Sequence, residues 1–199
     1  MEELAHYHKI FPPFAEVYTK GQKKNVQLAT LVFVSGLPFS FINEKLLKDV
    51  KHTYVKDPNH SVPFLSYFVT MGFFNTVSEL LSELKFVKIW LKGKRNRKKY
   101  IEVEVTAIPI PNRSWGIPIV PQSLLKEFEH LDLGFNFERK EKNDNKIDAD
   151  MYIGQDLYWT LMRDNVFRPK NSKVVAQESV FGWLLSGNCL SENDTYKIW

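Results

Sequence analysis

The sequence predicts a mainly β domain, in the form of a closed or partly closed barrel with a few short helices. Aromatic residues make up 14% of the 199 residues, and fifteen residues are Phe. Such a composition favours strands because aromatic side chains pack well on a pleated surface. Residues 101–105 alternate apolar with acidic side chains, which is typical of a strand with one buried face. Two pairs of apolar segments, each joined by a polar connection, predict hairpins.

Length and composition indicate one globular domain over residues 1–199, with its core between about residues 13 and 190. The hydrophobic content of 44% and the charged content of 25% are ordinary for a folded domain. The single cysteine, Cys189, excludes an internal disulfide and fits a reducing compartment. The acidic opening Met1-Glu2-Glu3 is unlike a secretory leader, and the longest apolar stretch is shorter than a spanning helix. We therefore expect an intracellular protein, cytoplasmic or nuclear, without membrane contact or cofactor.

The N-terminal third predicts a hairpin, a broken strand and a short helix. The hairpin strands are residues 15–19 and 26–30, with a polar, glycine-containing turn between them. The following stretch, TLVFVSGLPFSFINEKLL, predicts a buried strand that breaks at Ser35-Gly36 and resumes at residues 39–42. Asn43 is a favourable N-cap for the short helix that follows.

A run of six cations in eight residues joins two apolar segments in the middle of the chain. The segments are residues 86–91 and 100–105, and the connection KGKRNRKK occupies residues 92–99. The simplest interpretation is a solvated hairpin tip. A cluster of Lys and Arg can also bind phosphate, although no aromatic residue lies between the cations as a base-stacking platform would need. The nucleic-acid candidates are Lys92, Lys94, Arg95, Arg97, Lys98 and Lys99.

Helices and irregular segments are predicted at three further places. Residues 75–86 have apolar side chains at helical spacing, which favours an amphipathic helix over a broken strand, and residues 121–131 predict a better helix. Four prolines between residues 109 and 121 exclude a central strand there, because proline lacks the ladder donor. Residues 138–150 are mixed in charge and poor in apolar side chains, which predicts a flexible surface loop. Residues 121–150 are thus expected to be a helix and loop inserted into the barrel.

The C-terminal third carries the most specific pattern. An apolar strand ends in a glycine turn at Tyr152-Ile153-Gly154-Gln155-Asp156, an apolar helix starts at Leu157, and strand-like segments follow at residues 174–179 and 181–187. These blocks resemble the retropepsin-like aspartic peptidase domain of BEL/Pao-type retrotransposons. In that family a strand ending IG-x-D and an aromatic pair precede a terminus of the form vaq-(T/S)-x-x-GW-x-x-SG. The family also carries LLD-(S/T)-GS-x-x-SFI, where this chain has VFVSGLPFSFI.

The resemblance implies a retropepsin-like barrel, but the position of the catalytic aspartate holds Val34. Ser35 and Gly36 match the residues that follow the aspartate, and Leu37 stands where the family has its next serine. Aspartic peptidases need two carboxylates that share a proton, one to activate water and one to protonate the carbonyl oxygen. The family takes one aspartate from each of two protomers, so a homodimer of this chain would supply none. Val34, Ser35 and Gly36 are therefore interpreted as a relic active-site turn, with no catalytic residue.

The matched positions also give candidates for a binding cleft, and none for a metal. Asp156 is expected to cap the following helix rather than to act as an acid in the cleft. The histidines are scattered, and His6 and His8, the one pair at metal-ligand spacing, are more simply solvated. The cleft candidates are Ser40, Phe41, Ile153, Gly154 and Asp156.

The favoured hypothesis is a catalytically inactive pseudo-aspartic-peptidase of retrotransposon origin that acts as a protein-interaction or dimerisation module. Its partner would be a second copy of the chain or another protein or peptide. One alternative is an active aspartic endopeptidase, working through a heterodimer or a non-standard acid. A mixed pair with an aspartate-bearing protomer would hold only one carboxylate, so we expect activity at or near background from it. The other alternative is nucleic-acid binding through the basic hairpin at residues 92–99.

Overall fold

The computed structural model describes residues 10–22, 25–55, 85–94, 99–108, 114–116, 120–137, 146–170 and 172–188. Strands predominate among these residues, as the sequence predicts, and the helices are short. The helices described are α2 (Glu44–Leu47), α5 (Gln122–Glu127) and α6 (Gln155–Leu161).

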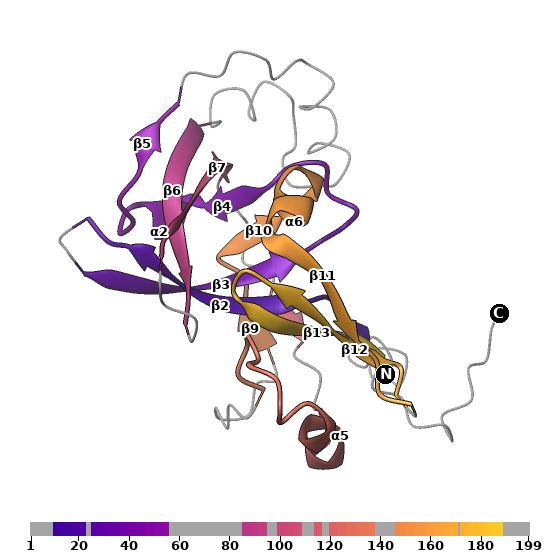
Figure 1. Cartoon of the computed structure of the whole chain (residues 1–199). Coiled ribbons are helices and arrows are strands. Elements are labelled where there is room, and N and C mark those ends of the chain that lie inside the picture. The colour runs from indigo at the N-terminus through magenta and orange to yellow at the C-terminus, as the bar shows by residue number, and fades with distance from the viewer. Residues whose placement is uncertain are drawn as a thin grey trace, which may run out of the picture.

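Six strands close into a barrel, which confirms the predicted architecture (Figure 1). In order around the barrel they are β2 (Phe14–Lys20), β3 (Val26–Phe33), β10 (Met151–Ile153), β4 (Phe41–Asn43), β7 (Ile101–Ile108) and β6 (Lys85–Gly93). Antiparallel pairing of β2 with β6, with Thr19 opposite Leu91, closes the ring. A short strand, β5 (Thr53–Tyr54), pairs with β6 outside the ring.

A second, four-stranded antiparallel sheet lies beside the barrel, with β13 against β2 (Figure 1). Its strands, in spatial order, are β1 (Ile10–Phe11), β13 (Gly182–Asn188), β12 (Val174–Ser179) and β11 (Met162–Phe167). A separate two-stranded sheet consists of β8 (Ser114–Gly116) and β9 (Lys146–Asp148). The first and last strands of the described chain are thus neighbours in one sheet.

Successive side chains of a barrel strand point to opposite faces, and this divides the hydrophobic core into two clusters. On β3, Leu31 and Phe33 belong to the cluster that fills the barrel, whereas Val32 points to the opposite face. Val32 belongs to a second cluster, together with Phe128 beyond α5 and Leu185 on β13. The second sheet and α5 therefore cover one side of the barrel with apolar side chains.

Several elements predicted from the sequence are confirmed. Residues 15–19 and 26–30 lie in the paired strands β2 and β3, and the strands on either side of the basic run pair as β6 and β7. The Asn43 side chain accepts a hydrogen bond from the Lys45 N–H at 3.0 Å and so caps α2. The helix α5 lies inside the range predicted for it.

Two local predictions need correction. The flexible loop predicted at residues 138–150 includes a strand, because β9 pairs with β8 through Ile147 and Trp115. A polar segment can form a strand when a partner supplies the ladder, and composition alone does not reveal that partner. The helix predicted at residues 75–86 does not include its last two residues, since Lys85 and Phe86 begin β6. Residues 75–84 lie outside the described residues.

Candidate functional site

The first turn of the site follows β3 directly. The Val34 N–H donates to the Ile153 carbonyl with an N···O distance of 2.9 Å, and the Leu37 N–H donates to the Val34 carbonyl at 3.0 Å. The second of these bonds closes a β-turn with Ser35 and Gly36, both exposed, at its centre. The Val34 side chain is half-buried and packs against the cluster outside the barrel. The residues of this turn present no ionisable side chain to solvent.

The second turn, at the end of β10, lies directly against the first. The strands β3 and β10 pair in parallel with Phe33 opposite Ile153, so both end at the same edge of the barrel. The Gln155 N–H donates to the Leu37 carbonyl at 2.7 Å, and the Gln155 side-chain amide donates to the Ser35 carbonyl. The structure therefore brings together the two turns that the sequence predicted to be neighbours.

A buried hydroxyl group connects the two turns. The Ser40 Oγ donates to Asp156 Oδ1 at 2.6 Å and accepts from the Gly154 N–H at 2.9 Å, while the Ser40 N–H donates to Asp156 Oδ2 at 3.0 Å. Asp156 Oδ1 also accepts from the N–H of Leu157, the predicted start of the helix, at 2.9 Å, but Asp156 is not the N-cap. The helix begins earlier than predicted, with Gly154 as its N-cap, and Asp156 is its second residue. A carboxylate in the first helical turn remains favourable with respect to the helix dipole, but its main partner is Ser40.

Two of the cleft candidates belong to the core instead. The side chains of Phe41 and Ile153 are fully buried. Phe41 stacks on Tyr152 with ring centroids 4.9 Å apart, and Ile153 belongs to the cluster inside the barrel. Neither side chain lines a surface cleft, because alternating strand residues next to the turns point into the two clusters. The exposed residues of the two turns are instead Ser35, Gly36, Gln155 and Asp156.

The acidic groups near the site are engaged in hydrogen bonds. Within the two turns, residues 34–37 and 153–156, Asp156 is the one acidic residue. Asp150 lies at the opposite end of β10, where its Oδ2 accepts from the Thr30 N–H at 2.8 Å. Burial raises the pKa of the Asp150 carboxyl above its usual 3.8, the Thr30 hydrogen bond lowers it, and the charge of Asp148 raises it. Asp150 and Asp156 are thus both held by hydrogen-bond donors.

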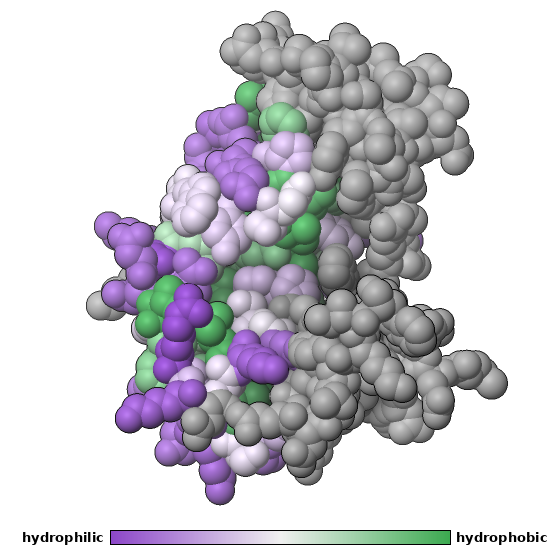
Figure 2. Space-filling model, turned by 90° about the vertical axis from the view of Figure 1, so that its right-hand side faces the viewer, coloured by the Kyte–Doolittle hydropathy of each residue, from purple (hydrophilic) through white to green (hydrophobic). Residues whose placement is uncertain are grey.

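Exposed apolar side chains lie on the helix and strand that follow the second turn. Trp159 on α6 is 73% exposed, and Val166 on β11 is 43% exposed. Figure 2 shows the side of the molecule that carries these elements, where apolar residues reach the surface between hydrophilic ones. The strand β11 is an edge of its sheet, and its pairing with β12 shifts register between Met162 and Val166. Such an irregularity protects an edge strand from pairing with another chain.

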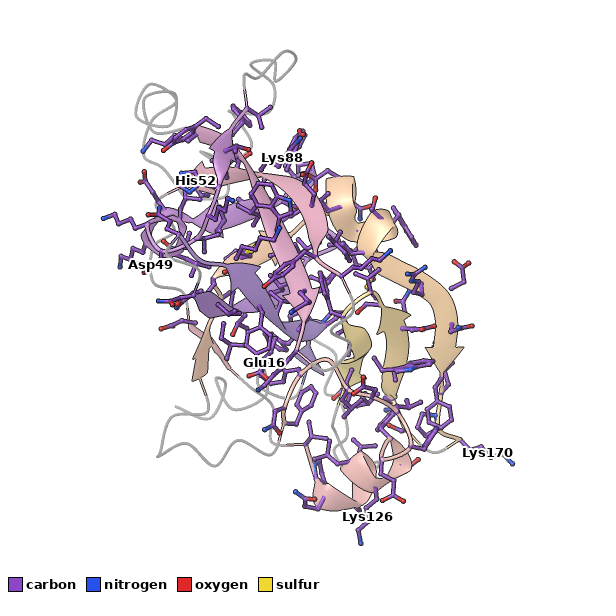
Figure 3. All side chains as sticks on the ribbon, turned by 60° about the vertical axis from the view of Figure 1, so that its left-hand side comes forward. Glu16, Asp49, His52, Lys88, Lys126 and Lys170 are labelled. Atoms are coloured by element: carbon purple, nitrogen blue, oxygen red, sulfur yellow. The ribbon has the colours of Figure 1, made fainter. Side chains whose placement is uncertain are left out.

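The described cations of the basic hairpin, Lys92, Lys94 and Lys99, have different surroundings. Arg95, Arg97 and Lys98 lie outside the described residues, and Lys99 is exposed. Lys94 is held by Glu16 on β2, with Nζ 2.9 Å from Oε2. Glu16 is 1% exposed and lies in the middle of the molecule in Figure 3. Lys94 therefore compensates a buried carboxylate and is not available to a phosphate in this state.

Sequence reasoning missed the aromatic partners of Lys92 and of two lysines outside the basic hairpin. The Lys92 Nζ lies 4.7 Å from the centre of the Tyr100 ring, and Lys20 lies over both Tyr100 and Trp90. Lys51 approaches Trp90 at 6.0 Å. The period-two pattern of β6 was a usable signal, because it places Trp90 and Lys92 on one face. The other members come from separate segments, and no sequence pattern joins them to this pair.

No group of three His, Cys, Asp or Glu side chains is placed to hold a metal ion in the described part of the chain. Among the same residues, no helix has the length and apolar character needed to cross a membrane. Comparisons of the chain with protein-family models, curated proteins and solved structures found no match.

Proposed function

We propose that this chain is a catalytically inactive, retropepsin-like domain of retrotransposon origin that acts as a protein-interaction or dimerisation module. The observation that carries the proposal is Val34. It follows β3 in a β-turn and is hydrogen-bonded to Ile153 at the end of the neighbouring parallel strand, and the resemblance assigns the catalytic aspartate to this position. The turn keeps Ser35 and Gly36, and its acid is replaced by an aliphatic side chain.

The chemistry of this class of peptidase cannot proceed through such a turn. One carboxylate must take a proton from the attacking water while a second donates a proton to the carbonyl oxygen. Valine has no lone pair, and the Ser35 hydroxyl is not a base without an activating partner. Asp156 lies in the second turn and not at the Val34 position, and Ser40 donates hydrogen bonds to both of its oxygens, so we assign it to holding the two turns together.

Binding does not require the missing acids. An extended peptide can be held by main-chain hydrogen bonds and side-chain pockets, and a second copy can pair through the same surface. The exposed residues Ser35, Gly36 and Gln155 and the exposed ring of Trp159 lie on the two turns and the helix that leaves them. These groups offer polar and apolar contacts of the kind found in interfaces.

Proteolysis assays with matched variants test the catalytic part of the proposal. The unaltered chain, Val34→Asp and Val34→Asn are incubated with an unstructured protein between about pH 4 and 7, where an aspartic dyad is active. We expect no inhibitor-sensitive cleavage by the unaltered chain or by Val34→Asn. Cleavage by Val34→Asp alone would support a retropepsin-type pairing of two restored carboxylates. Cleavage by the unaltered chain that an aspartic-peptidase inhibitor abolishes would show that the domain is an active enzyme.

Sedimentation velocity over a range of concentrations tests the binding part. A reversible dimer that Trp159→Ser weakens identifies a second copy as the occupant of this surface. A monomer that binds extended peptides from a random library, again through Trp159, identifies a peptide instead. A chain that remains monomeric and selects no peptide contradicts the proposed module.

A further inference from the structure

Three lysines and two aromatic residues gather on the outside of the barrel, where β2, β6 and the start of β7 meet. The Lys20 Nζ lies 5.0 Å from the centre of the Trp90 ring and 4.9 Å from that of Tyr100. The Lys92 Nζ lies 4.7 Å from Tyr100, and the Lys51 Nζ lies 6.0 Å from Trp90. We call these five residues the lysine–aromatic face.

The strand pattern explains why this face is outside the barrel. Along β6, Ile89 and Leu91 are fully buried, while the alternate residues Trp90 and Lys92 are half-buried on the opposite face. The antiparallel register places Tyr18 of β2 opposite Lys92, which brings the end of β2 alongside Trp90. Lys20, Trp90 and Lys92 therefore lie on paired strands, while Tyr100 directly precedes β7 and Lys51 follows α2.

The acidic side chains beside this face already have partners. Glu102, opposite Trp90 on β7, accepts from the indole Nε1 at 3.1 Å and pairs with Lys88 at 3.0 Å. Glu104 also pairs with Lys88, at 3.3 Å. Within the residues that the structure describes, the three lysines of the face make no ion pair. They present positive charge that the surrounding carboxylates do not neutralise.

We propose that the lysine–aromatic face binds single-stranded nucleic acid. Bases would stack on Trp90 and Tyr100, and phosphates would form ion pairs with the ammonium groups of Lys20, Lys51 and Lys92. Exposed cation–π contacts are weak, so an ammonium group can leave a ring for a phosphate when a base takes its place. Positive charge interleaved with rings is the combination that single-strand binding uses, whereas duplexes hide the base faces.

This site is independent of the two turns. Lys20 pairs with Val26 at the start of β3, whereas Val34 follows the end of the same strand. The eight residues of β3 span about 26 Å at the rise of an extended strand. Failure of one proposal therefore leaves the other standing.

Fluorescence anisotropy with a labelled strand of about 12 thymidines tests the proposal, since this length covers an ordinary single-strand site. Three phosphate contacts predict a slope of about −2 in a plot of log affinity against log salt concentration. The double variant Lys20→Gln/Lys92→Gln is expected to reduce that slope by about 1.4 and affinity at least tenfold. The matched control is Lys126→Gln/Lys170→Gln, which removes two exposed charges at the end of the molecule opposite His52 and Lys88 (Figure 3). We expect less than a twofold effect from the control.

Aromatic variants separate stacking from general attraction between charges. Trp90→Ala and Tyr100→Ala should each lower affinity about tenfold, whereas Trp90→Phe should retain most of it. Thermal unfolding of each variant shows whether the fold is kept. If Trp90→Ala does not fold, the comparison uses Tyr100→Ala and Trp90→Phe instead. Three results would overturn the proposal: equal losses in the two double variants, equal affinity for a duplex of the same length, or full affinity in folded variants without the rings.

Discussion

At the scale of single residues, Ser40 determines how the two turns are held together. Its hydroxyl group bonds both Asp156 and the Gly154 N–H, and the residue is 1% exposed. Ser40→Ala removes both bonds and leaves a buried N–H without this acceptor. We expect the free energy of unfolding to fall by about 1–3 kcal/mol, measured by urea denaturation. Ser35→Ala, an exposed serine in the neighbouring turn, is the control and should change stability by less than about 0.5 kcal/mol. Equal effects of the two substitutions would contradict this role of Ser40.

Asp150 provides a prediction about pH. Burial raises the pKa of its carboxyl in the folded state above the ordinary value of 3.8, which applies to the unfolded chain. At a pH between the unfolded pKa and the folded pKa, the folded chain therefore binds more protons than the unfolded chain. Stability contributed by this group is therefore present below its unfolded pKa and falls as pH rises to its folded pKa. Asp150→Asn keeps an oxygen for the Thr30 N–H and removes the titration. Relative to the unaltered chain, the variant should gain stability as pH rises from about 4 to 7, measured by urea unfolding at several pH values.

The control for this titration is Asp164→Asn, which removes an exposed carboxylate from β11. It changes net charge by the same amount without a buried site. Its stability relative to the unaltered chain, measured at the same pH values, shows how much of any effect comes from the loss of a charge alone. A pH dependence of Asp150→Asn no different from that of this control would contradict a raised pKa of the Asp150 carboxyl in the folded chain.

At the scale of elements, the contact between the two turns is close enough to require glycine at residue 154. A Cβ there would come within 3.0 Å of backbone atoms of Leu37 and Phe39, whereas a Cβ at Gly36 meets nothing within 4 Å. Gly154→Ala should therefore lower stability by about 1–3 kcal/mol through overpacking. Gly36→Ala should be neutral or raise stability by up to about 1 kcal/mol, because it restricts the unfolded chain. Melting temperatures of the two variants compare them directly, and a loss at Gly36 as large as that at Gly154 would refute this account.

The elements also show which parts of the fold the sequence can predict. The hairpins β2–β3 and β6–β7 pair segments that are close in sequence, and their alternation is visible in the residues themselves. The parallel pairing of β3 with β10 joins residues 120 apart, such as Leu31 and Met151. Periodicity carries no information on such a pairing, and only the resemblance of two distant motifs suggested it. The strand β9 was missed for the related reason that its partner, and not its composition, makes it a strand.

In the candidate sites, too, features that are local in the sequence were predictable, and features that depend on distant pairings were not. Val34, Ser35 and Gly36 were predicted as a turn because they are consecutive, and their contact with Ile153–Gly154 followed from the resemblance. The side-chain directions of Phe41 and Ile153 were not predicted, because the motif gives positions and not which face of the barrel they occupy. The lysine–aromatic face was missed because its five residues come from four segments that lie apart in the sequence. The register of β2, β6 and β7 brings three of them together, and a hydrogen bond from the Lys51 N–H to the Lys20 carbonyl adds the fourth.

At the scale of the whole molecule, the two hydrophobic clusters share strands. On β13, Leu184 belongs to the cluster inside the barrel, and its neighbour Leu185 belongs to the cluster outside it. A strand that contributes to both clusters cannot leave one without disturbing the other. The barrel and the four-stranded sheet are thus expected to depend on each other for stability, despite being separate sheets.

This dependence predicts one cooperative unfolding transition. Ile89→Ala removes a fully buried side chain inside the barrel, and Leu185→Ala removes one outside it. Each should lower the free energy of unfolding by about 2–5 kcal/mol. In both variants, urea curves from far-ultraviolet circular dichroism and tryptophan fluorescence should share a single shifted midpoint, as two-state unfolding requires. If Leu185→Ala instead separates the two curves, so that the second sheet unfolds while the barrel remains, then the sheet is an independent unit, and β13 does not couple the two clusters.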